Sequence, residues 1–519
     1  MKRHIITAFL GLLLFWSCFD DKGNYNYREI NQTTIGKLAE SYTVAADVGV
    51  LHIEPEIKMS MADPDDDRFD YLWIVKYTNY STIEIVDTIG RERVLDWQAD
   101  LPIYTYDMWL KVEDTQTGMV TQAKTQLSLT IYHGRGIMLA SEDAEGYFKG
   151  QMLVMMPGEE TVFYDNVLEY SGLPQLRGAV DFFHTGNNNP DYTRAVWIVT
   201  ESGTYFVNRL SLKMEDNFCT FDDKTYFKPE IPLRPIDIGP RIKDNKGDTG
   251  GYNNSMRFVL CDNGDIFHSW MSIQGDIYDL PVSMVDGEGF FKAKAPLFFP
   301  HKDMGFGVML CYDGDNERFL SIGLANTEAK KLADNAGEAF PWNQNGRAYV
   351  YGENTLSGAQ NGYSFAIMKE TTADAGRTYD YSIYEFYVTG PVKRAFYEVL
   401  REEAPLFGSA TSYAFSSKRT VVFYVAGGKL YAYDFDPAVQ KNYEIALADN
   451  HEVTMAKFDI QREPGSDFLY VATYNSSAGG TLYKYALDPD LNLVKLKSTP
   501  EEQWSGLGKV KNMSWRGSE

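Results

Sequence analysis

The chain has 519 residues, which exceeds the usual size of one domain, so we expect two or more domains. With 72 acidic residues against 49 Lys and Arg, its formal charge is −23; such a surface repels nucleic-acid phosphates, which excludes nucleic-acid binding. The 35 Tyr and 30 Phe favour strands over helices, because aromatic side chains suit the pleated surface of a sheet.

Residues 1–17 are predicted to be a signal peptide. They combine a positively charged start with an apolar run from Ile5 to Phe15 that is too short to span a bilayer. Ser17 then precedes Cys18, and this junction resembles the lipidation site of bacterial lipoproteins. We expect acyl chains on Cys18 to be the only membrane anchor. The alternative is an ordinary secretory signal followed by an incidental cysteine.

The segment after Cys18, residues 18–39, is predicted to be a lipidated linker. It begins with the sequence CFDDK, in which Asp20 and Asp21 stand just past the cysteine. Acidic residues at this place resemble the export signal that sends lipoproteins to the outer cell face in Gram-negative anaerobes with SusC/SusD importers. The alternative is that they belong to a solvated linker without a sorting role.

Residues 40–132 are predicted to form a β-sandwich. The strand FDYLWIV places Trp73 where sandwiches of the immunoglobulin type bury a large aromatic residue. A second strand, from Ile103 to Glu113, alternates with period two and ends in the turn sequence DTQTG. One face of it carries Tyr104, Tyr106, Met108, Leu110 and Val112. The sequence QLSLTIY, 126–132, would be the last strand.

The sequence CFDDKGNYNYREIN, followed by this sandwich, is similar to the PKD-like surface lipoproteins that are encoded beside SusC/SusD pairs. The resemblance implies an outer-membrane lipoprotein that faces the cell exterior. It implies as partners a SusC-like TonB-dependent transporter and a SusD-like lipoprotein, with an oligopeptide or glycan as ligand. No cofactor follows from it.

Residues 133–519 carry a repeated hairpin pattern. Two apolar runs meet at Gly427-Gly428, and the phrase LYAYDFDP that follows returns as LYKYALDP at Leu482–Pro489. Seven such turns, about 55 residues apart, are typical of propeller blades. We assign them to Gly146, Gly203, Gly264, Gly314, Gly362, Gly428 and Gly480. The sequence therefore predicts an all-β chain, with an N-terminal PKD/Ig-like β-sandwich followed by a seven-bladed β-propeller.

Short strands precede several hairpins, as at 180–183, 413–415 and 456–460, and we expect them to be the innermost strands of their blades. The sequence VKNMSW, 510–515, has the same character but no hairpin follows it. We therefore expect it to close the ring by completing the first blade, whose other strands lie near 137–156.

Motifs for chemistry are absent from the sequence. There is no HExxH, no G-x-S-x-G, no P-loop, no GxGxxG and no CxxC, so we predict no catalytic residue, no metal and no cofactor. Cys261 and Cys311 end apolar runs and are expected to be small buried hydrophobic residues. The acidic sequences at 262–265 and 313–316 are expected to be hairpin turns rather than cation-binding loops.

Polar loops supply the candidate ligand-binding residues. The sequence FPWNQNGR, 340–347, sets an aromatic ring beside three amides, which suits sugar stacking or capture of a peptide backbone. The alternative is a tryptophan packed at a blade corner. The candidates are Trp342, Asn343, Gln344, Asn345, His184, Trp270 and Tyr312.

Three functions remain open on this sequence. The leading hypothesis is a non-enzymatic accessory subunit of a SusC/SusD-type importer that helps to capture oligopeptides or glycans. The second is a stand-alone glycan-binding surface protein, whose affinity would be lost in Trp342→Ala. The third is a hydrolase or lyase with catalytic residues drawn from several blades.

Overall fold

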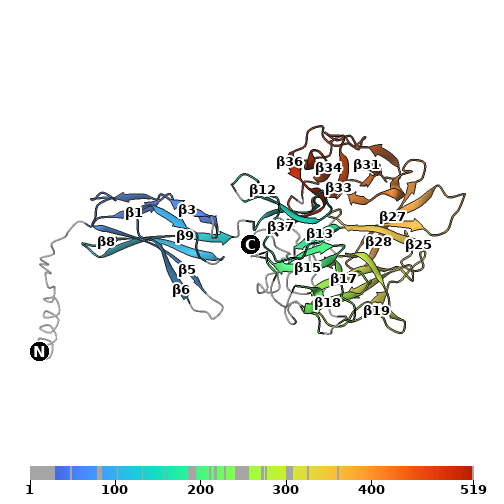
Figure 1. Cartoon of the computed structure of the whole chain (residues 1–519), viewed down its shortest axis with the longest axis horizontal. Helices are drawn as coiled ribbons and strands as arrows, with labels where there is room; N and C mark the ends of the chain where they lie inside the picture. The colour runs from blue at the N-terminus through green and yellow to red at the C-terminus, as the bar shows by residue number, and fades with distance from the viewer. Residues whose placement is uncertain are drawn as a thin grey trace, which may run out of the picture. The chain divides into compact units, whose positions relative to one another are not determined.

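The computed structural model describes residues 30–46, 49–78, 84–101, 103–130, 133–156, 158–184, 195–209, 212–214, 219–226, 229–239, 256–270, 274, 277–299, 308–323, 326–358, 362–463 and 465–516. The elements with described bounds are strands and two 3-10 helices, η2 (Phe221–Lys224) and η4 (Phe407–Ser409), so the prediction of an all-β chain is confirmed (Figure 1). The chain divides into two compact units after Leu129. In the described part of the chain, no helix has the length and apolar character needed to cross a membrane.

The first unit is built from one five-stranded and two two-stranded antiparallel sheets, in the orders β2-β9-β8-β5-β6, β1-β4 and β3-β7. Strand β1 lies inside the segment 18–39 that the sequence assigns to a linker. The bounds are β1 Thr33–Gly36, β2 Ser41–Ala45, β3 Val50–Ile53, β4 Glu56–Met59, β5 Phe69–Thr78, β6 Glu84–Gly90, β7 Leu95–Gln98, β8 Thr105–Asp114 and β9 Met119–Thr130.

The core of this unit follows the predicted alternation. Trp73 is fully buried on β5, as predicted, and its indole N–H donates to the carbonyl of Glu92 at 3.0 Å. Along β8 the buried face runs from Tyr106 to Val112, whereas Tyr104 precedes the strand and is 45% exposed, although its ring lies 5.5 Å from that of Tyr106. Strand β9 begins seven residues before the predicted last strand. The reason is that the turn at 115–118 forms a hairpin in which β9 pairs with β8 along the whole of β8.

In the second unit, the described residues form seven antiparallel sheets of three or four strands and one small two-stranded sheet, β19-β20. We number the seven sheets from the one that contains both ends of the unit. They are β37-β10-β11-β12, β13-β14-β15, β16-β17-β18, β21-β22-β23-β24, β25-β26-β27-β28, β29-β30-β31-β32 and β33-β34-β35-β36.

The strand bounds in the first four sheets are β37 Lys509–Arg516, β10 Gly136–Glu142, β11 Phe148–Val154, β12 Val162–Tyr164, β13 Ala179–His184, β14 Ala195–Thr200, β15 Gly203–Asn208, β16 Pro235–Gly239, β17 Met256–Cys261, β18 Ile266–Trp270, β21 Ala293–Phe298, β22 Val308–Asp313, β23 Arg318–Gly323 and β24 Lys330–Lys331. Those in the last three are β25 Arg347–Asn354, β26 Ser364–Glu370, β27 Tyr379–Tyr387, β28 Val392–Leu400, β29 Ser412–Phe415, β30 Val421–Ala426, β31 Lys429–Asp434, β32 Lys441–Glu444, β33 Glu452–Phe458, β34 Leu469–Asn475, β35 Gly479–Tyr485 and β36 Glu502–Leu507. The small sheet joins β19 (Met284–Val285) and β20 (Gly289–Phe290).

The first strands of neighbouring sheets lie side by side. Contacts join β16 with β21, β21 with β25, β25 with β29, β29 with β33, β33 with β37, and β37 with β13. The predicted closure is confirmed, because β37 pairs with β10 from Gly136↔Arg516 to Glu142↔Lys509. The arrangement is that of a β-propeller-like fold (Figure 1).

Hydrophobic clusters explain why these sheets assemble. One cluster of buried residues fills each junction between neighbouring sheets, including the junction between the seventh sheet and the first. Second strands such as β14 (AVWIVT) and β30 (VVFYVA) are buried along their whole length. A sheet that is covered on both faces needs apolar residues at every position, which is why these strands do not alternate. Cys261 and Cys311 are fully buried, as predicted, and each is a free thiol in a different one of these clusters.

Gly146, Gly264, Gly314 and Gly428 lie in the turn between the second and third strands of a sheet, while Gly203 and Gly480 lie at the start of the third strand itself. Gly362 lies in neither place: it precedes β26, in the connection from β25, and residues 371–378 make the corresponding hairpin. The prediction for Gly362 was wrong because the pattern is a glycine followed three residues later by an aromatic residue. Phe365 on β26 completes this pattern after Gly362, although no hairpin turn lies there. At Gly264 and Gly428 the φ angles of 85° and 72° show why the turn requires glycine.

Candidate functional site

Polar side chains interrupt the apolar first strands at matching places. In β13, β16 and β37 the pairing with the second strand shifts by one residue, and an Asp or Asn follows the shift. These residues are Asp181, Asp237 and Asn512, and each side chain accepts a hydrogen bond from the next backbone N–H, at 2.7, 2.9 and 2.8 Å. The repeated sequences VDF, IDI and KNM carry this signal, which is separate from the pattern of the hairpin turns.

These first-strand polar residues connect neighbouring sheets. Asp237 on β16 accepts the backbone N–H of Leu297 on β21 at 2.7 Å. The ammonium of Lys457 on β33 donates to Asn512 on β37 at 2.9 Å. Glu353 on β25 accepts the backbone N–H of Phe415 on β29 at 2.9 Å. Their main contribution is therefore structural, since they satisfy backbone groups where the first strands approach one another.

Glu353→Gln is expected to stabilise the protein at pH 8.5 far more than at pH 5.5. Burial raises the pKa of Glu353 to about 7, against 4.5 for an exposed glutamate, although the hydrogen bond from Phe415 opposes the shift. The folded chain therefore keeps the proton that the unfolded chain releases, and stability is lost as the pH rises from about 4.5 to 7. An amide avoids this loss, and the gain at pH 8.5 should be about 1–2 kcal/mol. Urea unfolding at both pH values measures the gain in stability. Equal gains at pH 5.5 and pH 8.5 would contradict the raised pKa of Glu353.

A basic cluster lies where β37 ends. It consists of His133, Arg209 and Arg516, three residues that are far apart in sequence. Arg516 is 2% exposed and stands opposite Gly136 in the β10–β37 pair, while Arg209, 9% exposed, follows β15 in the second sheet. The guanidinium of Arg516 donates to the backbone carbonyl of Arg209. His133 is half-buried and adjoins the start of β10.

Burial and repulsion between positive charges govern the electrostatics of the basic cluster. Burial, and secondarily the positive charge of Arg209, lowers the pKa of Arg516 to about 9. Burial, and then the charge of Arg516, lowers the pKa of His133 to about 4. Nη1 of Arg516 and Nε2 of His133 are buried and have no hydrogen-bond partner. Such an arrangement can recognise an anion, because a buried donor without an acceptor is costly.

The structure places Trp342 in the core, which corrects its expected exposure. It is 2% exposed and packs against Phe319 and Phe386, with ring centroids 5.3 and 5.5 Å apart, at the junction of the fourth and fifth sheets. The ammonium of Lys393 lies 5.6 Å from its ring centroid. The alternative of a packed tryptophan is the one observed, and Trp342→Ala would test core packing rather than ligand stacking.

The three amides beside Trp342 have different surroundings. Asn343 donates to the carbonyl of Leu332 at 2.7 Å and to Asp334 at 2.8 Å, so it ties the loop together. Asn345 is buried and accepts the backbone N–H of Arg347 at 3.1 Å. Gln344 is exposed in a left-handed backbone conformation with φ 45°. Only Gln344 among them is available at the surface.

Of the remaining candidates, Tyr312 joins this packed group and the others lie elsewhere. Tyr312 is buried, and its hydroxyl donates to the carbonyl of Arg347 at 2.6 Å. Trp270 ends β18 and is 37% exposed. His184 ends β13 and pairs with Val196 through its backbone, but its side chain is outside the described part of the structure. The predicted residues therefore do not assemble into one site.

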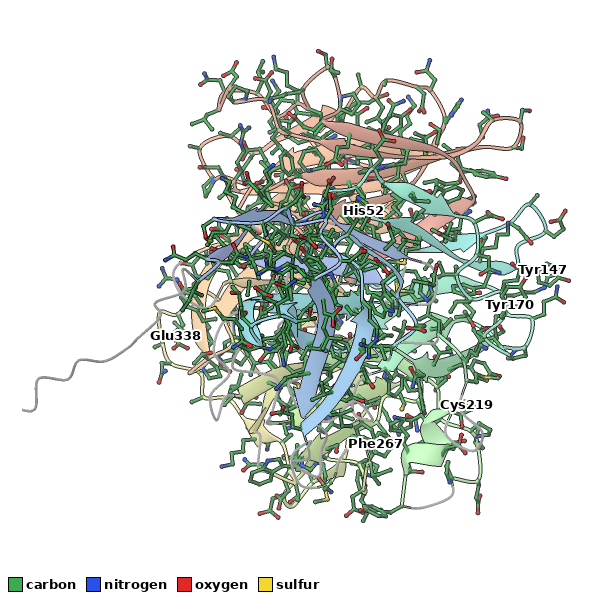
Figure 2. All side chains as sticks on the ribbon, turned by 90° about the vertical axis from the view of Figure 1, so that its left-hand side faces the viewer. His52, Tyr147, Tyr170, Cys219, Phe267 and Glu338 are labelled. Atoms are coloured by element: carbon green, nitrogen blue, oxygen red, sulfur yellow. The ribbon has the colours of Figure 1, made fainter. Side chains whose placement is uncertain are left out.

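Exposed aromatic side chains occur on other loops, where no sequence pattern distinguishes them from buried ones. Tyr170 follows β12 and is 79% exposed, and Figure 2 shows it at the periphery of its unit. Tyr226 and Phe290 are exposed near the third sheet. In the described residues, no group of three His, Cys, Asp or Glu side chains could hold a metal ion. Cys18, Asp20 and Asp21 lie outside the described residues.

Comparisons with solved structures give distant likenesses. A quinoprotein alcohol dehydrogenase-like protein from Bacteroides thetaiotaomicron is 13% identical, with 90% of this chain and 97% of that chain covered and a TM-score of 0.35. YCF48 from Cyanidioschyzon merolae is 13% identical, with coverages of 65% and 92% and a TM-score of 0.30. PorZ from Porphyromonas gingivalis, a surface component of the type-IX secretion system, is 11% identical, with coverages of 80% and 56% and a TM-score of 0.17.

Comparisons at the level of sequence concern the N-terminal part of the chain. No curated protein matches the chain. The model of the PKD-like family matches residues 18–155, which include all the described strands of the first unit and run just past β11 of the second. The N-terminal domain of this protein is therefore PKD-like.

Proposed function

We propose that the protein is a non-enzymatic surface lipoprotein that serves as an accessory subunit of a SusC/SusD-type TonB-dependent importer. It is anchored in the outer membrane through Cys18, and it helps to capture oligopeptides or glycans at the cell exterior. The PKD-like domain spaces the second unit from the membrane anchor.

The observation that carries the proposal is where the family match begins. The PKD-like match starts at residue 18, the cysteine that would become the lipidated N terminus after cleavage. The sequence CFDDK at this point resembles a lipidation site joined to a surface-export signal. The sequence and the family match thus agree on one boundary, and both suit a tethered protein.

We also propose that each of the seven sheets is one blade of a seven-bladed propeller. Support comes from the seven clusters that fill seven junctions and from the β37–β10 pairing that closes the series. A closed ring presents loops at two faces on a rigid support, which suits ligand capture without chemistry.

Cys18→Ala is expected to release the protein from the membrane fraction, because its acyl chains are the proposed anchor. The double variant Asp20→Ala/Asp21→Ala should remain lipidated but should no longer be exported to the cell surface. Protease added to intact cells should therefore not digest it. Asp67→Ala, an exposed acidic residue of the first unit, serves as the control and should behave as wild type. Membrane retention of Cys18→Ala would contradict the anchor.

The importer role is tested by isolating the protein with its neighbours from solubilised outer membranes. Co-purification of SusC- and SusD-like proteins with the wild type is the expected result. Their absence under mild detergent, with the protein intact and surface-exposed, would contradict the accessory role. Turnover of peptides or glycans by the purified protein would contradict a non-enzymatic one.

A further inference from the structure

We propose that three exposed side chains near η2 form a docking surface for a partner protein whose contact face is apolar and edged with Lys or Arg. The three are Tyr226, Ile231 and Leu280, and we call them the apolar patch. The inference goes beyond the capture of nutrients, because it names a surface that holds a protein. It rests on the proposed function only for the place of the test, which is the surface of intact cells.

The apolar patch is unusual in how much of each side chain meets solvent. Tyr226 is 69% exposed, Ile231 78% and Leu280 66%. Together they expose an area on the order of a few hundred Å², the range in which an apolar patch on a folded protein commonly marks an interaction site. Single exposed apolar residues are ordinary, and what sets these three apart is that they lie together.

Backbone hydrogen bonds bring the three segments of the patch together. The N–H of Tyr226 donates to the carbonyl of Tyr278, which lies two residues before Leu280, at 3.0 Å. The N–H of Leu233, two residues after Ile231, donates to a carboxylate oxygen of η2 at 3.0 Å. Because η2 ends two residues before Tyr226, each patch residue lies close to this one short helix.

The segments that carry the patch are rigidly supported. Phe221 of η2 and Tyr278 are fully buried in the cluster between the second and third sheets, with ring centroids 5.0 Å apart. Ile231 and Leu280 each precede a proline, which restricts a residue to extended conformations. A partner that buries these side chains therefore loses less conformational entropy than it would on a mobile loop.

The charges beside the patch indicate its occupant. Glu230 precedes Ile231 and Asp279 precedes Leu280, and both acidic residues are exposed. An apolar centre with an acidic edge is complementary to an apolar surface edged with Lys or Arg. A second copy of this chain suits the patch poorly, because each copy has a formal charge of −23. A glycan also suits it poorly, since aliphatic side chains offer no hydrogen bonds to sugar hydroxyls.

The direct test is photo-crosslinking from the full lipoprotein on intact cells. A photoreactive amino acid replaces Ile231 or Leu280, and Tyr170, which is 79% exposed but follows β12 of the first sheet, is the control position (Figure 2). We expect both patch positions, and not the control, to capture one protein through a segment in which apolar residues adjoin Lys or Arg. Capture of a second copy, a lipid or a glycan, or of nothing, would overturn the proposal.

Tyr226→Ala and Tyr170→Ala form the matched pair of variants. Titration of the purified chain with the identified protein should show that Tyr226→Ala weakens binding about 30-fold, the effect of removing an aromatic hot spot from an interface. Tyr170→Ala should bind as the wild type does. The double variant Glu230→Lys/Asp279→Lys should bind more weakly, and most clearly at low salt, because it reverses the acidic edge. Unchanged affinity in Tyr226→Ala and in the double variant would overturn the proposal.

The docking surface and the importer role fail on different results. If SusC- and SusD-like proteins co-purify with the wild type and equally well with Ile231→Ser/Leu280→Ser, the importer role stands and the docking surface fails. If neither co-purifies with the wild type and both patch positions capture another protein with a basic edge, the docking surface stands and the importer role fails.

Discussion

Deletion of residues 509–516 is expected to abolish cooperative folding of the second unit. The deletion removes β37, the first strand of the first sheet, and exposes the edge of β10 along its whole length. It also removes Val510, Met513 and Trp515 from the cluster that joins the seventh sheet to the first. Burial of each side chain is worth about 1.5–3 kcal/mol, which together rivals the 5–15 kcal/mol stability of a typical domain.

Calorimetry and limited proteolysis measure this effect, and deletion of residues 517–519 alone is the control. The control should unfold like the wild type in one sharp transition for the second unit. A truncated protein whose second unit still unfolds cooperatively near the wild-type temperature would contradict the account of closure. Trp515→Ala removes one side chain of this cluster rather than the whole strand, and it should lower the free energy of unfolding of the second unit by about 3–5 kcal/mol.

Trp73→Ala is expected to unfold the first unit at temperatures where the second unit remains folded. The side chain is fully buried in the sandwich core, and such truncations cost about 3–5 kcal/mol. The variant also leaves the carbonyl of Glu92 without its indole donor. Because the two units have separate cores, the transition of the second unit should not move.

Trp109→Ala provides the matched control for this prediction. Trp109 lies on β8, directly opposite Ile74 of β5, and faces away from the core that holds Trp73. Its ring is half-buried and lies under Lys124, 5.6 Å from the ammonium, a contact worth about 0.5–1 kcal/mol. Equal losses of stability in Trp109→Ala and Trp73→Ala would contradict the prediction, because they would mean that the outer face of the sheet is packed as tightly as the inner face.

Strand positions and ring closure could be predicted from the sequence because they depend on local patterns. The alternation in β8 and the apolar runs in β14 and β30 report which faces are covered. The final strand was recognisable because VKNMSW repeats the character of the other first strands. Gly362 shows the limit, since one glycine and one aromatic residue fit two different connections.

Ligand-binding residues could not be predicted in the same way, because exposure depends on distant segments. Trp342 looked available beside three amides, but Lys393, fifty-one residues later, covers its ring, and Asp334 accepts its backbone N–H at 2.7 Å. The basic cluster has no linear signal at all. His133 and Arg516 meet only because the two ends of the second unit share a sheet.

The pairing of β37 with β10 also bears on how the protein is made. The strand that completes the first sheet follows all the other described strands in the chain, so it leaves the ribosome after them and would also cross any membrane after them. Until then, every shorter nascent chain exposes the edge of β10, so interrupted synthesis yields products that proteases can recognise. Chains that include β37 would therefore accumulate in preference to shorter ones, so the pairing selects against incomplete second units before the protein reaches its place of work.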